Sequence, residues 1–308
     1  MRRLISFAAW APLAALPTAA LAHAGEAHGP PGAPGWTFAP EVVVPLALVP
    51  FVYLVGQARL RTRARGGRPA LSRNAALFAF GWALLVAALV SPLHEGGERS
   101  FALHMIEHEI IMLPAALLLV AARPGPVLLW GLPRAIRVGL APVLRWPLWR
   151  GMAGAIPATV LQAAVLVLWH LPPLFDRALR SEGWHIAQHL SFVASALLFW
   201  WAMLPRGGER GGDGHGRGTA AFCLFVTSLV GGGLGALMAL SRSPWYPAYA
   251  ALGTSPIGLS PEQDQQLAGV IMWVPGGLFH LSVALVLLAQ MLRGKAPTGQ
   301  ARKVSATV

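Results

Sequence analysis

Seven long apolar stretches, separated by short polar or proline-rich segments, dominate the pattern of the chain. They cover approximately residues 41–58, 74–92, 101–122, 153–171, 185–204, 218–240 and 266–292. Each is close to the ~20 residues that a helix needs to cross the hydrocarbon core of a bilayer. Because lipid offers the backbone no hydrogen-bond partner, crossing segments of this length are predicted to be helical. The pattern therefore predicts an all-α fold, a polytopic membrane helical bundle of about seven transmembrane helices.

The first 22 residues are typical of a secretory signal peptide. Arg2 and Arg3 precede an apolar core, which ends in the small-residue sequence Ala20-Leu21-Ala22. The alternative is a retained first helix, which Pro12 and Pro17 would interrupt. We therefore expect cleavage after this segment.

Cleavage would leave His23 as the new N-terminus, with His28 close behind it. A terminal amine and its own imidazole can chelate copper, and the alternative is an ordinary polar tail. The chain is thus predicted to have four parts: a signal peptide (1–22), a periplasmic N-terminal tail (23–40), a seven-helix membrane domain (41–292) and a cytoplasmic basic tail (293–308).

Composition supports a membrane protein. Of the 308 residues, 55% are hydrophobic and 12% are charged, whereas soluble domains are about 25% charged. The net charge of +12 would indicate a nucleic-acid partner in a soluble protein. Here the basic residues lie in loops between apolar stretches, so we expect contact with membrane lipid and no nucleic acid. The single cysteine, Cys223, excludes an intrachain disulfide and a CxxC metal site.

Lys and Arg residues are distributed unevenly between the loops. Most of the 24 fall in alternate loops and in the C-terminal tail, and the opposite loops carry only Arg99, Arg177, Arg180 and Arg242. Because basic loop residues concentrate on the cytoplasmic side, we expect a periplasmic N-terminus and a cytoplasmic C-terminus. The predicted location is the bacterial inner (plasma) membrane, as a multi-pass protein. The arginine-rich segment 127–150 is expected to lie along the cytoplasmic interface.

The stretch 101–120 carries four ionisable side chains in an otherwise apolar sequence: His104, Glu107, His108 and Glu109. An Asp, Lys or Arg at the centre of a membrane helix costs about 2.5–3.5 kcal/mol, so ionisable residues kept there indicate a function. His104 and His108 are four residues apart and therefore share one face of a helix.

The same four-residue spacing recurs at His185 and His189, and His170 ends the preceding stretch on the same side of the membrane. Imidazole is the commonest metal ligand in proteins. Two such pairs on neighbouring helices predict one four-nitrogen metal site, or two sites of two, near the outer surface. Asp264 is a further candidate, either as a ligand or as a partner that orients one, and the alternative is a solvated acid at a helix start.

Other residues of the same types are expected to be structural. We expect His94 to be a solvated loop residue and His280 to make a hydrogen-bonded contact between helices. Met105, Met112 and Met272 could bind Cu(I), but we expect them in the core.

The sequence HMIEH also matches HxxEH, the inverted zinc-protease signature, in which the glutamate activates a zinc-bound water. A membrane-embedded zinc-dependent hydrolase using Glu107 is therefore the enzyme alternative. A haem b bundle is a weaker one, because imidazoles of one HxxxH pair lie too close to occupy opposite axial positions.

Three segments carry a resemblance to a known family: HMIEHEIIMLPAALLLVAARP from His104, LWHLPPLFDRALRSEGWHIAQHLSFVASALLFWW from Leu168, and DQQLAGVIMW from Asp264. Together they resemble the polytopic CtaG-type cytochrome c oxidase assembly family, which is unrelated to the single-span copper chaperone of the same name. Glu107 and Glu109 stand where Gln and Met are common in that pattern.

The resemblance implies a multi-span protein that is needed to make a functional haem–copper oxidase, at the stage of copper loading. It singles out the motif positions His104, His108, Trp169, His170, Asp176, His185, His189 and Asp264. We therefore expect an assembly factor and not an enzyme, with haem–copper oxidase subunits and a periplasmic copper donor as partners. Its expected metal ligands are His104, His108, His170, His185, His189 and Asp264, with copper as the metal and zinc as the alternative. A metal-free assembly scaffold is the third possibility.

Overall fold

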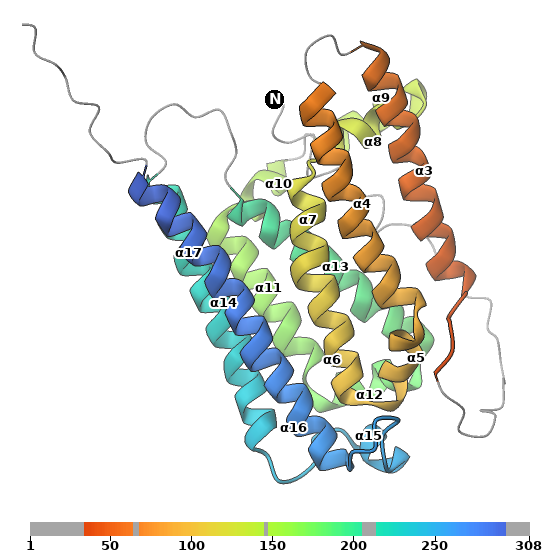
Figure 1. Cartoon of the computed structure of the whole chain (residues 1–308), viewed down its shortest axis with the longest axis vertical. Coiled ribbons are helices and arrows are strands. Elements are labelled where there is room, and N and C mark those ends of the chain that lie inside the picture. Colours follow the sequence, from red (N-terminus) through yellow and green to blue (C-terminus); the bar gives the residue numbers. More distant parts are fainter. Residues whose placement is uncertain (1–33, 64–67, 145–146, 205–213, 294–308) are drawn as a thin grey trace, which may run out of the picture.

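The computed structural model describes residues 34–63, 68–144, 147–204 and 214–293, and every regular element in these ranges is a helix (Figure 1). The predicted all-α membrane bundle is therefore confirmed. The expected signal peptide, the tail with His23 and His28, and the basic tail beyond Arg293 lie outside the described residues.

Six helices in the described ranges, two of them continued through π-helical segments (η), are long and apolar enough to cross a membrane. They are α3 (Pro40–Arg63), α4 (Arg68–Val90), α6 (Phe101–Ile110) with η1 (Ile111–Ala115) and α7 (Ala116–Ala121), α13 (Glu182–Met203), α14 (Gly214–Leu240), and α16 (Pro261–Ile271) with η2 (Met272–Gly276) and α17 (Gly277–Arg293).

The expected fourth span is a bent pair of helices and not one straight helix. α11 (Ala155–Trp169) and α12 (Pro172–Arg180) meet at an angle of 71°. Leu171 between them is extended, with φ −66° and ψ 126°, because a residue before proline is pushed out of the α region. The described chain therefore has seven crossings only if this pair counts as one.

Short helices lie at the two ends of the bundle (Figure 1). At one end are α5 (Pro92–Arg99), α12 and α15 (Pro247–Leu252), and at the opposite end are α8 (Gly125–Gly131), α9 (Arg134–Leu144) and α10 (Pro147–Met152). Since α6 follows α5 and α13 follows α12, both HxxxH pairs lie at the α5 end of the bundle.

Both π-helical segments contain a proline, Pro114 in η1 and Pro275 in η2. Proline lacks the backbone donor that an α-helix needs, and a π-helical turn is a frequent accommodation inside a long helix. The indole of Trp200 on α13 donates to the carbonyl of Met112 in η1 at 2.8 Å. This bond fixes α13 against the helix that carries the first histidine pair.

Close contact between α14 and α16 depends on glycine. A Cβ atom on Gly269 would lie 2.4 Å from the carbonyl oxygen of Gly235, and one on Gly235 would lie 2.6 Å from that of Gly269. Small residues at such crossings let membrane helices approach closely. The contact holds α16 in the bundle and with it Asp264, which reaches across to α6.

Candidate metal centre

Asp264 stabilises the start of α6 through hydrogen bonds. Its carboxylate accepts hydrogen bonds from the Ser100 hydroxyl at 2.7 Å and from the Phe101 backbone N–H at 2.6 Å. A negative charge at a helix N-terminus is favourable, and these two donors satisfy both carboxylate oxygens. Asp264 is 3% exposed, so it is not the solvated acid that was the alternative to a metal-site role. Its contacts place it at the helix that carries the histidines and not among them.

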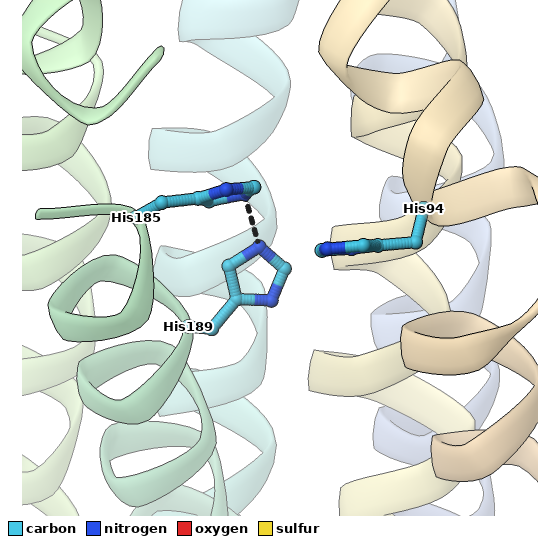
Figure 2. Close-up of side chains that lie close together, drawn as sticks. All are labelled: His94, His185 and His189. Atoms are coloured by element: carbon cyan, nitrogen blue, oxygen red, sulfur yellow. Dashed lines mark hydrogen bonds between the residues drawn. The ribbon is translucent and has the colours of Figure 1, made fainter. Parts of the chain in front are cut away.

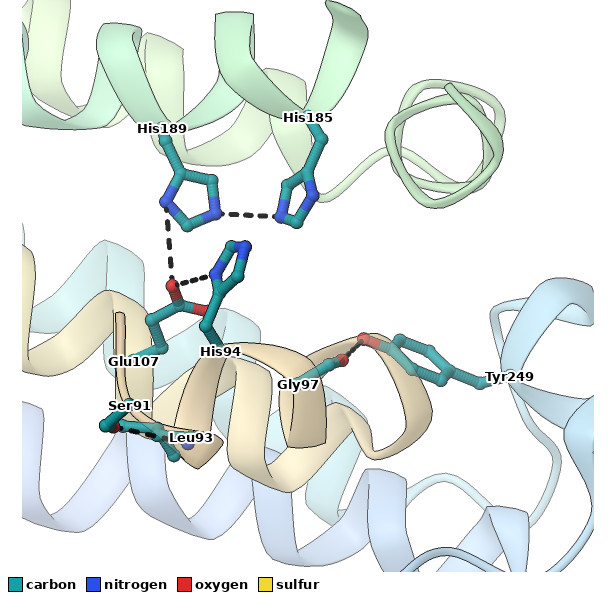
Figure 3. Close-up of polar contacts among 8 residues, drawn as sticks. All are labelled: Ser91, Leu93, His94, Gly97, Glu107, His185, His189 and Tyr249. Carbon is teal, nitrogen blue, oxygen red and sulfur yellow. Dashed lines mark hydrogen bonds and ion pairs between the residues drawn. The ribbon is translucent and has the colours of Figure 1, made fainter. Parts of the chain in front are cut away.

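The short helix α5 folds back against α6 through two glycines. A Cβ atom on Gly97 would lie 3.2 Å from the Cα of His104 and 3.3 Å from Oε2 of Glu107. The hydroxyl of Tyr249 on α15 donates to the Gly97 carbonyl at 2.5 Å, and this hydrogen bond helps to hold α5 against α6 (Figure 3). This contact turns the side chain of His94, three residues earlier, toward the bundle.

His94 meets His185 and His189 where α5 faces α13 (Figure 2). One ligand atom from each of the three imidazoles lies within 4.8 Å of the others. The rings of His94 and His185 are stacked with centroids 5.3 Å apart, and the two Nε2 atoms of His185 and His189 are 2.9 Å apart. Tetrahedral coordination with bonds of about 2.0–2.1 Å places ligand nitrogens about 3.3 Å apart, so a small side-chain movement would admit an ion.

Glu107 orients two of these imidazoles (Figure 3). Its Oε1 accepts a hydrogen bond from Nδ1–H of His94 at 2.7 Å and lies 3.8 Å from Nδ1 of His189. With Nδ1 facing the carboxylate, the Nε2 atoms of His94 and His189 are the ones turned toward His185. Burial lowers the pKa of His94, but the hydrogen bond and the charge of Glu107 outweigh it, so the pKa lies above its ordinary value. Carboxylate–histidine pairs of this kind fix the tautomer of metal ligands.

His104 and His108 lie immediately behind these three residues. They are 1% and 4% exposed, and their rings meet edge to face with centroids 4.2 Å apart. The His108 ring centroid is 5.1 Å from that of His189, and the His104 ring centroid is 5.7 Å from that of His185. Neither ring has a hydrogen bond through a nitrogen in the described structure. The Gly97 carbonyl faces His104, but outside hydrogen-bond geometry, and it already accepts from Tyr249.

His170 reaches the same region from the bend between α11 and α12. Its Nδ1–H donates to the Leu166 carbonyl at 2.7 Å, which leaves Nε2 buried and without a partner among the described residues. The Phe175 ring lies against both His170 and His104, with centroids 6.1 Å and 5.2 Å away. The hydroxyl of Tyr246 donates to the His170 carbonyl at 3.0 Å and fixes the bend.

A family model described as cytochrome c oxidase caa3 assembly factor matches residues 51–294 of the chain. The chain belongs to this family. No curated protein and no solved structure matches the chain. The match begins within α3 and ends just after α17, so it includes every histidine described above. The chain is thus an assembly factor for cytochrome c oxidase, and the family description names no metal.

In this assembly factor the two predicted histidine pairs come together. The ring centroids of His104 and His189 are 6.2 Å apart, and those of His108 and His189 are 5.1 Å apart. His170 lies beside them, and Asp264 does not. Their role as metal ligands stays a prediction.

The expectation that His94 is a solvated loop residue is wrong. Its side chain is 12% exposed and it sits on a helix. Ser91-Pro92 is a helix-start signal, with the Ser91 hydroxyl accepting from the Leu93 N–H at 3.3 Å, and it could have revealed α5. No local signal shows that α5 folds back onto α6.

The remaining candidates are structural. The expected hydrogen bond of His280 to another helix is wrong, because its Nδ1–H donates to the Gly276 carbonyl of its own helix at 2.8 Å. Its contact with another helix is the stacking of its ring on Trp200 of α13, with centroids 5.8 Å apart. Met105, Met112 and Met272 belong to the buried apolar core, as expected. His280 is not grouped with His94, His185 and His189 among the described residues.

Proposed function

We propose that this assembly factor holds copper as cargo for a haem–copper oxidase, through His94, His185 and His189, and that it is not an enzyme. The observation that carries the proposal is the convergence of three imidazoles beside a buried carboxylate that orients two of them. Neutral imidazole is a good ligand for copper, and ligands on rigid helices hold the geometry that a metal needs. A cargo ion also requires access, and two of the three ligands, His94 and His185, are only partly buried.

The zinc-hydrolase alternative fits the geometry less well. Its general base would be Glu107, which must reach a zinc-bound water. Here Oε1 of Glu107 is occupied by His94 at 2.7 Å, and the side chain is 0% exposed. Only Oε2 would be left to accept a proton, and it is buried away from solvent, so the arrangement suits the orienting of ligands better than the activation of water.

The proposed orientation places the histidine end of the bundle in the periplasm. Arginines gather at the opposite end, where Arg59 donates to the Trp130 and Gly131 carbonyls at 2.8 and 3.2 Å and where Arg63 and Arg137 lie over the Trp130 ring. Basic residues favour the cytoplasmic side. Copper would then arrive from a periplasmic donor and leave to an oxidase subunit whose metal site faces the same compartment.

Cells that depend on this protein for oxidase assembly provide the test. With His94→Ala, we expect oxidase activity and oxidase copper to fall together at an unchanged level of the assembly factor. His280→Ala is the matched control, since it removes a buried histidine outside the cluster, and it should leave both unchanged.

Two outcomes would contradict the proposal. Full oxidase activity in the His94→Ala and His185→Ala/His189→Ala strains would support a metal-free scaffold. Tightly held zinc, with a hydrolytic activity that Glu107→Gln abolishes, would support the enzyme.

A further inference from the structure

The histidine cluster contains more imidazole side chains than one metal ion can bind. Six histidines gather there: the rings of His94, His104, His108, His185 and His189 contact one another, and His170 is linked to them through the Phe175 ring, which also contacts His104. A metal ion held by imidazoles in a protein takes about four ligands or fewer. The arrangement therefore raises the question of how the six nitrogens are shared.

The structure divides them into two groups. Ligand atoms of His94, His185 and His189 lie within 4.8 Å of one another, and no set that includes His104 or His108 meets this criterion in the part of the chain that the structure describes. His104 and His108 instead face each other on α6, with ring centroids 4.2 Å apart. They form a second pair of ligands behind the first group.

Apart from the Gly97 carbonyl, which faces His104 outside hydrogen-bond geometry, the described neighbours of the two imidazoles in this second pair are aromatic rings. The Phe175 ring lies 5.2 Å from the His104 ring, and the Phe192 ring lies 4.7 Å from the His108 ring, measured between centroids. Buried polar atoms without partners are rare in native proteins, and each one calls for an explanation such as a bound ion. His170 adds Nε2, a third buried nitrogen acceptor without a partner.

We infer that the assembly factor has two adjacent copper positions, an outer one at His94, His185 and His189 and an inner one at His104 and His108 with His170 beside them. This inference rests on the proposed function. Monovalent copper accepts two or three nitrogen ligands, so each group is sufficient for one ion. Glu107 supplies a negative charge beside the outer position and offsets the repulsion between two cations.

The solvent exposure of the ligands indicates which of the two copper positions an ion reaches first. His94 and His185 are partly exposed, whereas His104, His108 and His170 are 1%, 4% and 4% exposed. An ion entering from the α5 side therefore reaches the outer position first. His185 and His189 adjoin both groups, so passage inward needs only exchange of imidazole ligands, with no change in the oxidation state of copper.

Titration of the full-length protein in lipid nanodiscs with Cu(I) alone, against a chromogenic Cu(I) chelator, tests the inference. His23→Ala/His28→Ala serves as the background, so that the N-terminal imidazoles add nothing to the count. We expect two tightly held ions in this background. His94→Ala should weaken one ion at least 100-fold and keep the other, and His104→Asn/His108→Asn should also leave one. His280→Ala should still bind two.

Binding of one ion by the background protein would overturn the inference and leave the proposed function standing. The clearest such result would be that His94→Ala and His104→Asn/His108→Asn then bind no ion. No ion at all would overturn both. The number of ions bound by the background protein does not depend on whether the cluster variants fold. Metal-free thermal unfolding and size-exclusion profiles identify any variant that has lost its structure, and for such a variant the background count decides.

Discussion

Replacing Glu107 with glutamine separates the metal-orienting role of this residue from any role in folding. The side chain is 0% exposed, its Oε1 lies 2.7 Å from Nδ1 of His94, and the same oxygen lies 3.8 Å from Nδ1 of His189. Glutamine has nearly the same shape and can still accept one hydrogen bond, but it carries no charge. The variant therefore keeps the packing and removes the electrostatic part of the interaction.

The magnitude follows from these contacts. A hydrogen bond to a charged group contributes about 1.5–3 kcal/mol and a neutral one about 0.5–1.5 kcal/mol, so the His94 contact alone should lose about 1–1.5 kcal/mol. Affinity falls by the part of this loss that is greater in the metal-bound state, with a factor of about ten for every 1.4 kcal/mol. We expect copper to bind about 10–100-fold more weakly, the usual effect of losing a partner that orients a ligand.

The assay is competitive Cu(I) titration of the full-length chain, with metal-free thermal unfolding measured in parallel. Glu109→Gln is the matched control, because Glu109 is a buried carboxyl on the same helix that faces Gly276 and not the histidines. Glu109→Gln should leave copper affinity unchanged. Wild-type affinity in Glu107→Gln, or an equal loss in both variants, would refute the orienting role.

Three further predictions concern the elements that position the site. Gly97→Ala would place a Cβ 3.2 Å from the Cα of His104. The overpacking should lower the free energy of unfolding by about 1–3 kcal/mol and weaken copper binding. Unaltered thermal unfolding and copper affinity would contradict this prediction. Asp264→Asn removes one acceptor from the start of α6, where the Phe101 N–H donates at 2.6 Å, and should cost about 1–3 kcal/mol in chemical unfolding, while an unchanged midpoint would count against it. Burial, reinforced by nearby carboxylates, raises the pKa of Tyr249 well above its ordinary value, so its contribution to stability should be complete below about pH 10 and be lost above it. Tyr249→Phe should therefore make the free energy of unfolding fall less steeply between about pH 9 and 11. The same pH profile in both proteins would argue against the burial of the phenol.

The local patterns that predict helices and paired histidines act over short distances. Long apolar stretches identify the crossing helices, and the four-residue spacing places His104 with His108 and His185 with His189 on single helix faces. That the two pairs come within 6.2 Å, centroid to centroid, depends on how α6 packs against α13, which no local pattern fixes.

Tertiary contacts decide the features that local patterns do not reveal. His94 enters the site because Gly97 allows α5 to lie against α6 and because Tyr249, far away in sequence, donates to the Gly97 carbonyl. Asp264 is a helix-start acid in sequence, but its carboxylate binds the start of another helix, 163 positions away. The bend at Leu171 does have a local cause, the proline that directly follows it.

X-ray absorption at the copper edge, on full-length protein purified from copper-supplemented cells, tests the central claim most directly. The histidine cluster predicts a shell of nitrogen atoms at about 2.0 Å from copper, with the multiple scattering typical of imidazole, and a lower copper content in His185→Ala/His189→Ala, which lacks two of the three proposed ligands. An absence of copper, or a copper signal that the double substitution leaves unchanged, would contradict the claim.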